Sequence, residues 1–206
     1  MKHIVLLAAC VAMAAAHHGH VPELRAIARV GDPNNPANIQ GNVTFTQLHD
    51  GKVRIEGTIL GLPHGQYGFH VHEKGDLTGG CLSTGGHFNP EHKQHGHPND
   101  EERHVGDLGN VEFDDTRIGR IDFTDSLISL VGEHSILGRA VVLHERADDF
   151  GRTEHPDSRK TGNAGGRVAC GVIGILDPVD GWSNTASLAS IAPSMLLLSS
   201  LTVLLR

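Results

Sequence analysis

Residues 43–56 read Val-Thr-Phe-Thr-Gln-Leu-His-Asp-Gly-Lys-Val-Arg-Ile-Glu. Apolar and polar side chains alternate in 43–46 and again in 53–56, which is the period of two that a half-buried β-strand requires. The Asp50-Gly51 pair between the two segments is a strong signal for a hairpin turn. This stretch therefore predicts two antiparallel strands joined by a short turn, and it favours an all-β fold.

The rest of the central region continues the strand pattern. Further short strands are predicted at 24–30, 68–72, 118–123, 140–144 and 169–175. Seven or eight short strands in about 150 residues favour a sandwich or a barrel. Two segments, 73–105 and 145–167, interrupt the pattern, and loops of such length are usually functional or disordered. The first is rich in histidine, which favours function.

The first 16 residues predict a signal peptide. Lys2 precedes an apolar run over 4–16 that is too short to span a bilayer and ends in Ala14-x-Ala16, a small-residue cleavage signal. A buried N-terminal helix is the alternative interpretation. Cleavage after Ala16 leaves one domain over 17–180, long enough for a single hydrophobic core. The sequence thus predicts a secreted, extracellular protein.

Residues 181–206 predict a small-residue linker and a hydrophobic C-terminal tail. Small residues at 184–186, a polar spacer and an apolar end over 195–205 fit a GPI-attachment signal, which is removed when the lipid anchor is added. A transmembrane helix over 188–205 is weakened by Pro193 and several serines. A retained soluble tail would expose a large apolar patch. The favoured interpretation is a GPI anchor that holds the protein at the outer cell surface.

Cysteine use, one sequon and the net charge bear on compartment and partners. Removal of Cys10 with the signal peptide leaves Cys81 and Cys170, and an even pair in an oxidising compartment predicts a disulfide. Asn42 begins an Asn-Val-Thr sequon, so it is a candidate N-glycosylation site. A net charge of −7 with no basic run argues against nucleic acid as a partner.

Histidines gather near the ends of two predicted strands. His70 and His72 close the strand at 68–72, and the period of two places both imidazoles on one face. The loop that follows adds three imidazoles and a carboxylate, a set that suits tetrahedral zinc without a thiolate: His87, His95, His104 and Asp107. His144 ends the apolar run 140–143. Each histidine alone could be an ordinary polar residue, but the whole set predicts a metal centre.

Four segments carry a family resemblance. They are GFHVHE at 68–73, GHFNP at 86–90, DEERHVGDLGN at 100–110 and GNAGGRVACGVIG at 162–174. With their spacing, over about 150 residues, they resemble copper/zinc superoxide dismutase. The resemblance implies an eight-stranded antiparallel Greek-key β-sandwich or flattened barrel with two long functional loops. It also implies an oxidoreductase that converts two superoxide anions and two protons to oxygen and hydrogen peroxide through copper redox cycling.

The same resemblance implies a role for particular residues. Copper would be held by His70, His72, His87 and His144, and zinc by His87, His95, His104 and Asp107. His87 would then bridge the two metals and carry a proton during turnover. Asp148 would link His70 to His95 and fix their orientation. Arg167 would receive the superoxide anion, assisted by Arg159 and Lys160, and Cys81 with Cys170 matches the family disulfide.

The sequence also bears on the oligomeric state and on alternative functions of the same fold. The apolar segment 172–175 resembles the terminus that relatives bury between subunits, which implies a homodimer, although Lys74 stands where dimeric intracellular relatives often carry an aromatic residue. A copper-delivery or metal-sequestering protein, or a structural cell-surface module, could use the same fold. The complete ligand set together with Arg167 favours the enzyme.

Overall fold

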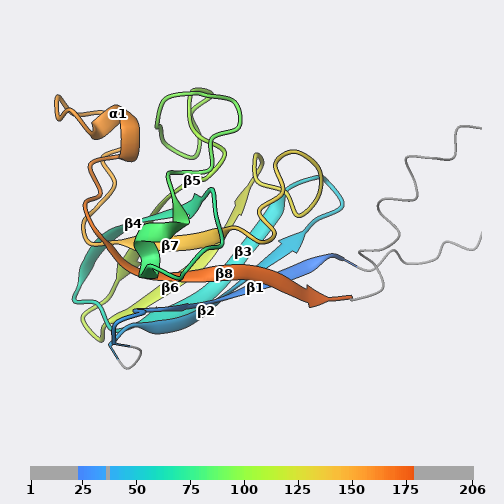
Figure 1. The fold of residues 1–206 in the computed structure, drawn as a ribbon, viewed down its shortest axis with the longest axis horizontal. Coiled ribbons are helices and arrows are strands. Elements are labelled where there is room, and N and C mark those ends of the chain that lie inside the picture. The colour runs from blue at the N-terminus through green and yellow to red at the C-terminus, as the bar shows by residue number, and fades with distance from the viewer. Residues whose placement is uncertain (1–22, 36–37, 179–206) are drawn as a thin grey trace, which may run out of the picture.

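Eight β-strands make up most of the described part of the chain in this computed structural model, which covers residues 23–35 and 38–178. They are β1 Arg25–Gly31, β2 Gln40–Gln47, β3 Val53–Leu60, β4 Gly65–His72, β5 Asp107–Phe113, β6 Ile118–Asp125, β7 Ala140–His144 and β8 Arg167–Asp177. A 3-10 turn, η1 Gly80–Thr84, and a single helical turn, α1 Ser158–Thr161, lie in the two long connections (Figure 1).

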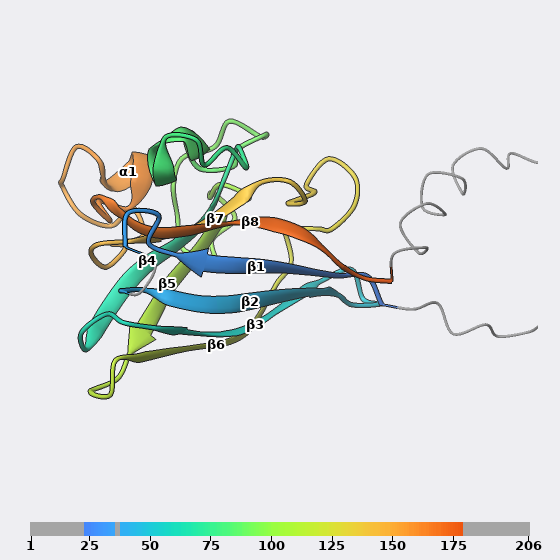
Figure 2. The same ribbon diagram turned by 60° about the horizontal axis from the view of Figure 1, so that its bottom comes forward.

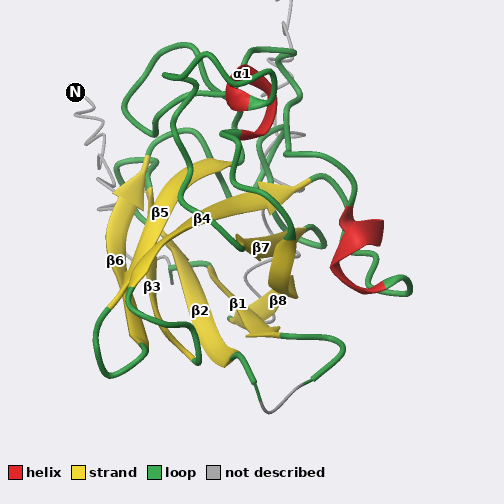
Figure 3. Cartoon of the chain, turned by 90° about the vertical axis from the view of Figure 1, so that its left-hand side faces the viewer, coloured by secondary structure: helices red, strands yellow, loops and turns green. Residues whose placement is uncertain are grey.

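The strands close into one antiparallel barrel in the order β1-β2-β3-β6-β5-β4-β7-β8. β4, β5 and β6 follow one another as neighbours, and β7 returns to lie beside β4, which is a Greek key. Figure 3 looks toward one end of the ring of strands, and Figure 2 shows β1, β2, β3 and β6 stacked as one wall. The prediction of an eight-stranded antiparallel Greek-key fold is confirmed in its barrel form.

The β2–β3 hairpin forms as its sequence predicts. Gln47 pairs with Val53, and the backbone N–H of Leu48 donates to the carbonyl of Lys52 across the turn. Gly51 has a φ of 87°, in the left-handed region that glycine enters without a steric penalty. Along β3 the buried residues Val53 and Ile55 alternate with exposed ones, so every second side chain faces the barrel interior.

Strand β5 was not among the strands predicted from the residue pattern. Gly109, at a φ of 85°, and Asn110 interrupt the alternation of apolar residues there, although Val111 and Phe113 face the core. Asp107, predicted as a loop residue, is the first residue of this strand. The two predicted loops are therefore the β4–β5 and β7–β8 connections, residues 73–106 and 145–166.

The barrel interior holds a continuous apolar core. Phe45, Ile59, Phe69 and Phe113 are among its fully buried members. Burial of a side chain of this size contributes roughly 1.5–3 kcal/mol. This core gives the strands a rigid wall, against which the long connections pack.

Two buried links fasten the β4–β5 connection to the barrel. The predicted disulfide between Cys81 and Cys170 is confirmed, and it joins η1 to β8 across 89 residues. Closing a loop of that length removes roughly 4–5 kcal/mol of chain entropy from the unfolded state. Arg103, 1% exposed, forms an ion pair of 2.6 Å with Asp125 and donates to the carbonyl of Asp107.

Several expectations concern residues near or beyond the described ends. The predicted signal peptide, 1–16, and the predicted tail, 181–206, lie outside the described residues. Within the described part, no helix is long and apolar enough to cross a membrane. In the apolar segment of β8, Ile173 is fully buried in the core, while Val172 and Ile175 are 39% and 51% exposed. Ile173 therefore stabilises the barrel and offers no surface to a second subunit.

Candidate metal centre

The structure gathers all seven residues predicted as metal ligands on one side of the barrel. His70 and His72 project from β4 to the same face, as the period of two requires. β7 pairs with β4, and this pairing brings His144 next to them. The remaining four come from the β4–β5 connection and the start of β5, and every member of the set is at most 8% exposed: His87, His95, His104 and Asp107.

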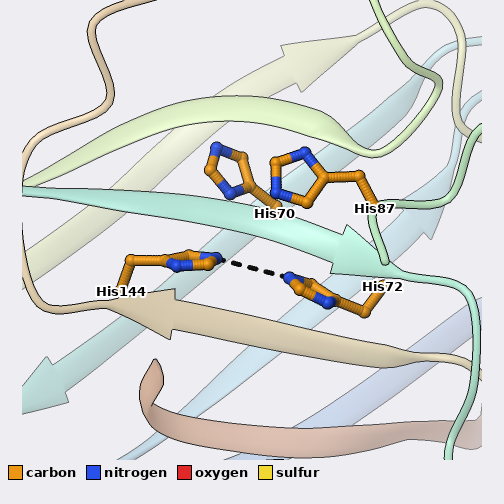
Figure 4. Close-up of side chains that lie close together, drawn as sticks. All are labelled: His70, His72, His87 and His144. Carbon is orange, nitrogen blue, oxygen red and sulfur yellow. Dashed lines mark hydrogen bonds between the residues drawn. The ribbon is translucent and has the colours of Figure 1, made fainter. Parts of the chain in front are cut away.

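Two overlapping groups result. In the first, one ligand atom from each residue lies within 4.8 Å of every other: His70, His72, His87 and His144. Figure 4 shows their rings converging on one space, with Nε2 of His72 3.3 Å from Nε2 of His144. We call this group the four-histidine cluster. Four imidazole nitrogens and no carboxylate make it suitable for copper.

The second group consists of His87, His95, His104 and Asp107, and its ligand atoms also lie within 4.8 Å of one another. We call it the three-histidine–aspartate cluster. Oδ1 of Asp107 lies 2.9, 3.0 and 3.1 Å from Nδ1 of His87, His95 and His104, respectively. A buried His3Asp set of this kind suits tetrahedral zinc.

Hydrogen bonds hold the outward nitrogens of these rings. Nδ1 of His72 donates to the carbonyl of Gly85 at 2.9 Å, and Nδ1 of His144 donates to the carbonyl of Gly165 at 3.2 Å. Asp148 accepts at 2.8 Å from Nε2 of His70 and at 2.8 Å from Nε2 of His95. Each of these rings therefore keeps its other nitrogen for the cluster that it faces.

The ring nitrogens that face into the clusters are the atoms that a metal ion would bind. Nδ1 of His70, Nε2 of His87 and Nδ1 of His95 are buried without a hydrogen-bond partner in the described structure. Nδ1 of His95 is near Asp107 but lies outside hydrogen-bonding geometry. Buried polar atoms are rarely left unpaired because each such group costs free energy. Metal ligation would satisfy all three nitrogens, so these residues fit a two-metal site.

The electrostatics of the clusters favour metal binding as well. Burial lowers the pKa of His70, His72 and His87, and burial together with repulsion from His87 lowers the pKa of His144 to about 4. These rings are neutral at neutral pH, the form that binds metals.

The zinc-type cluster contains an ionised carboxylate. Burial alone would raise the pKa of Asp107, but hydrogen bonds with His104 and His87 hold it well below its usual range. Burial alone would likewise lower the pKa of His95, but its contacts with Asp107 and Asp148 raise it to about 9. A divalent cation would replace this imidazolium proton between the same groups.

Arg167 lies beside the four-histidine cluster. It begins β8 and pairs with His144 in the sheet, and its charge contributes to the lowered pKa of His72 and His144. Its guanidinium donates to the side chain of Thr84 and to three carbonyls, those of Cys81, Leu82 and Gly85. The loop that carries the disulfide thus holds Arg167 in place. Arg159 and Lys160 are exposed on α1.

The comparisons with known proteins agree with this geometry. The family model described as "Copper/zinc superoxide dismutase (SODC)" matches residues 39–173. The chain belongs to the copper/zinc superoxide dismutase family. It is 50% identical over 175 residues to "Extracellular superoxide dismutase [Cu-Zn]" of Drosophila melanogaster, covering 84% of this chain and 97% of that protein. A solved structure titled "Crystal Structure Analysis of the clock protein EA4" is 69% identical, with a TM-score of 0.72, covering 78% of this chain and 99% of that one.

As a superoxide dismutase of the copper/zinc family, the protein is an oxidoreductase with copper and zinc as its cofactors. Its reaction converts two superoxide anions and two protons to oxygen and hydrogen peroxide. Three other histidines of the long connections stay outside the metal groups of the described structure: His92 and His155 are exposed, and His97 packs against Phe150.

Sequence reasoning missed the groups that hold the ligands from behind. The carbonyls of Gly85 and Gly165 are backbone atoms, for which the sequence carries no signal beyond two glycines. Asn110 and Arg103 lie inside a quoted motif, but no residue pattern indicates what their side chains contact. Apart from Arg103, which contacts Asp107 four residues away, these partners come from segments that are distant along the chain.

The lowered histidine pKa values predict an acid-labile metal-free protein. Between the folded pKa values and the unfolded value of about 6.5, the unfolded chain binds more protons, so the free energy of unfolding falls as the pH is lowered. Each such histidine contributes up to about 1.4 kcal/mol per pH unit. His95 has a raised pKa, so its contribution is lost instead as the pH rises from about 6.5 through about 9.

Urea unfolding of the metal-free protein at pH 5, 6 and 7 measures this slope. We expect stability to rise with pH across this range, and we expect His144→Gln to reduce the slope because it removes one depressed group. Asn99→Ala, a change of an exposed side chain that does not titrate, serves as the control and should leave the slope unchanged. A stability that is flat or falls from pH 5 to pH 7 would contradict the prediction.

Proposed function

We propose that the four-histidine cluster holds copper and the three-histidine–aspartate cluster holds zinc, with His87 shared between them. The observation that carries this assignment is the position of His87, which offers a ligand atom to both groups. Its Nδ1 lies 2.9 Å from Asp107 and 3.3 Å from Nδ1 of His104, while its buried Nε2 has no hydrogen-bond partner. Among the described histidines that form these groups, His87 alone belongs to both.

Copper held by the four-histidine cluster would supply one-electron redox chemistry, and zinc held by the three-histidine–aspartate cluster would supply a fixed positive charge beside His87. The residues of the chain supply the rest. His87 takes and returns a proton at Nε2 while its Nδ1 remains held in the other cluster. Asp148 keeps His70 and His95 in one orientation during this exchange, through its two 2.8 Å hydrogen bonds.

Arg167 binds and orients the superoxide anion. No ion pair with a carboxylate involves Arg167 among the described residues, so its charge is available to a small anion. Its hydrogen bonds to the 81–85 segment fix the guanidinium before the anion arrives. Arg159 and Lys160 add positive charge to the approach. A protein with a net charge of −7 can still attract an anion, because a locally positive cleft focuses the field.

Residue changes in each cluster should remove the two metals separately. His144→Ala is expected to lose copper and activity while keeping most of the zinc, because His144 belongs to the four-histidine cluster alone. Asp107→Ala is expected to lose zinc first and to loosen the 73–106 connection, since its carboxylate contacts three histidines. Elemental analysis of the purified variants checks both results. Equal loss of both metals in both variants would contradict the assignment.

A change at Arg167 tests whether this residue steers the substrate. Arg167→Ala is expected to slow superoxide dismutation about 10–150-fold, the rate equivalent of the roughly 1.5–3 kcal/mol of a charge-assisted hydrogen bond. Metal content should stay unchanged, and Arg167→Lys should fall between the two. The wild-type rate should decrease with ionic strength, because screening limits steering to about 8–10 Å at 0.1–0.15 M salt. The Ala variant should depend less on salt.

Arg54, exposed on β3, provides the matched control. Arg54→Ala removes an arginine that pairs with Glu56 and Asp122, on a strand that lies between β2 and β6, whereas the strands that carry ligands are β4, β5 and β7. We expect its rate at matched copper content to equal that of the wild type. Equal rates for wild type and Arg167→Ala at matched copper content would remove the steering role of Arg167.

The protein is extracellular in this proposal, and its surface carries two further features. The predicted signal peptide, the disulfide between Cys81 and Cys170 and the extracellular relative support secretion. Asn42 is exposed on β2 and can receive the predicted glycan. Val172 and Ile175, exposed on β8, support a homodimer formed across this strand.

The C-terminal tail is replaced by a GPI anchor near residue 184 in the same proposal. The support is the order of small residues, polar spacer and apolar end in the sequence. Phosphatidylinositol-specific phospholipase treatment of expressing cells is expected to release the activity. A variant that ends at residue 180 serves as the control and should appear in the medium without treatment. Activity that stays on the cells, together with an antibody signal from residues 195–206, would show that the tail is retained.

A further inference from the structure

Asp148 contacts both clusters from an irregular segment of the chain. It follows β7 in the β7–β8 connection and is 3% exposed. Its two carboxylate oxygens lie 2.8 Å from His70 and 2.8 Å from His95, one oxygen to each ring. A loop residue can hold two rings in register only if its own backbone is held against something rigid.

Asn110 provides that support. Its Oδ1 accepts a hydrogen bond of 2.7 Å from the backbone N–H of Asp148, and its Nδ2 donates one of 3.0 Å to the backbone carbonyl of the same residue. One planar amide thus pairs with both backbone groups of Asp148, as a neighbouring strand would. Asn110 belongs to β5 and lies opposite Gly68 on β4, the strand that also carries His70.

Close packing fixes the carboxylate as well. The backbone N–H of Phe150 donates to Oδ1 of Asp148 at 2.7 Å. Gly162, at a φ of 67°, lies against the same oxygen: a Cβ there would come within 1.9 Å of Oδ1 of Asp148 and 2.6 Å of Nε2 of His95. A shift of the Asp148 backbone would therefore change the direction in which its oxygens reach the two rings.

We propose that Asn110 is a positioning residue: by holding the backbone of Asp148 against β5, it sets the alignment of His70 and His95 and so couples the geometry of the two metal sites. The inference rests on the assignment of these sites under Proposed function. Asn110 touches neither ring nitrogen in the structure, so its effect passes through Asp148.

The test uses the intact protein with copper in one site and zinc or Co²⁺ in the other. Zinc transfer to a chromophoric chelator gives a release rate, and the visible spectrum of Co²⁺ reports ligand geometry independently of activity. Loss of an outer partner of a metal ligand costs about 10–100-fold in metal affinity, so we expect Asp148→Ala to release zinc faster within that range. Asn110→Ala, which acts one step further away, should release zinc about tenfold faster and shift the Co²⁺ bands.

A double variant separates positioning from general loosening. If Asn110 acts through Asp148, the Asn110→Ala/Asp148→Ala protein should release zinc no faster than Asp148→Ala alone, whereas independent effects would multiply. Asn110→Asp keeps the acceptor for the Asp148 N–H and loses the donor, so it should be intermediate, and it serves if Asn110→Ala does not fold. Asn99→Ala, which removes an exposed amide of the β4–β5 connection, should match the wild type.

The outcomes are distinct for the two proposals. A wild-type protein that does not take up both metals would overturn the proposed sites themselves. A normal wild type with unchanged zinc release and Co²⁺ spectrum in Asn110→Ala, or with multiplying effects in the double variant, would overturn only the positioning role of Asn110.

Discussion

Six imidazoles and two carboxylates are buried side by side against the barrel wall, and their burial constrains everything around them. Buried polar groups without partners are destabilising, and like-charged groups in contact repel one another. In the structure, carbonyl or carboxylate groups accept hydrogen bonds from the outward nitrogens of four rings, so these nitrogens are not left unpaired. Nitrogens that face inward, such as Nε2 of His87, are left for metals. The same arrangement therefore suits both clusters to metal cations.

The barrel and the two long connections divide the work of positioning. Strand pairing between β4 and β7 fixes the relative positions of His70, His72 and His144, because the register of the pair gives each residue a single partner position. The β4–β5 connection has little regular structure, so it depends on links such as the disulfide and the buried Arg103–Asp125 pair. Arg103 also donates to the carbonyl of Asp107, so one guanidinium links β6 to the metal-cluster residue that begins β5.

The disulfide connects this stability to the chemistry. Cys81 and Gly85 donate no side-chain chemistry to the reaction, yet their carbonyls hold Arg167, and the Gly85 carbonyl also accepts from His72. The segment that the disulfide tethers therefore orients a cation for the substrate and a ring of the four-histidine cluster at the same time. Because the 81–85 segment fixes the guanidinium of Arg167, a protein of net negative charge presents a fixed positive charge beside the four-histidine cluster.

Much of the fold could be read from local residue patterns. The hairpin at 43–56 and the other predicted strands follow from side-chain alternation and a turn pair, which depend on residues a few positions apart. β5 was missed because Gly109 and Asn110 break that alternation, and its pairing with β4 is a long-range property. The ligand set was predicted from its motifs, since each motif lies within a short segment.

The sequence by itself determined the strand pattern, the hairpin, the pair of cysteines and the candidate metal ligands, because these are written in residue type and spacing. The family resemblance implied how the ligands divide between two clusters. Only the tertiary structure decided that Ile173 faces the core, that the carbonyls of Gly85 and Gly165 hold two rings, and that Asn110 braces Asp148. The hydrogen bonds among these contacts join residues that are 13 to 38 positions apart in the sequence. Their partners are chosen by barrel closure, which brings distant segments together and leaves no local mark in the sequence.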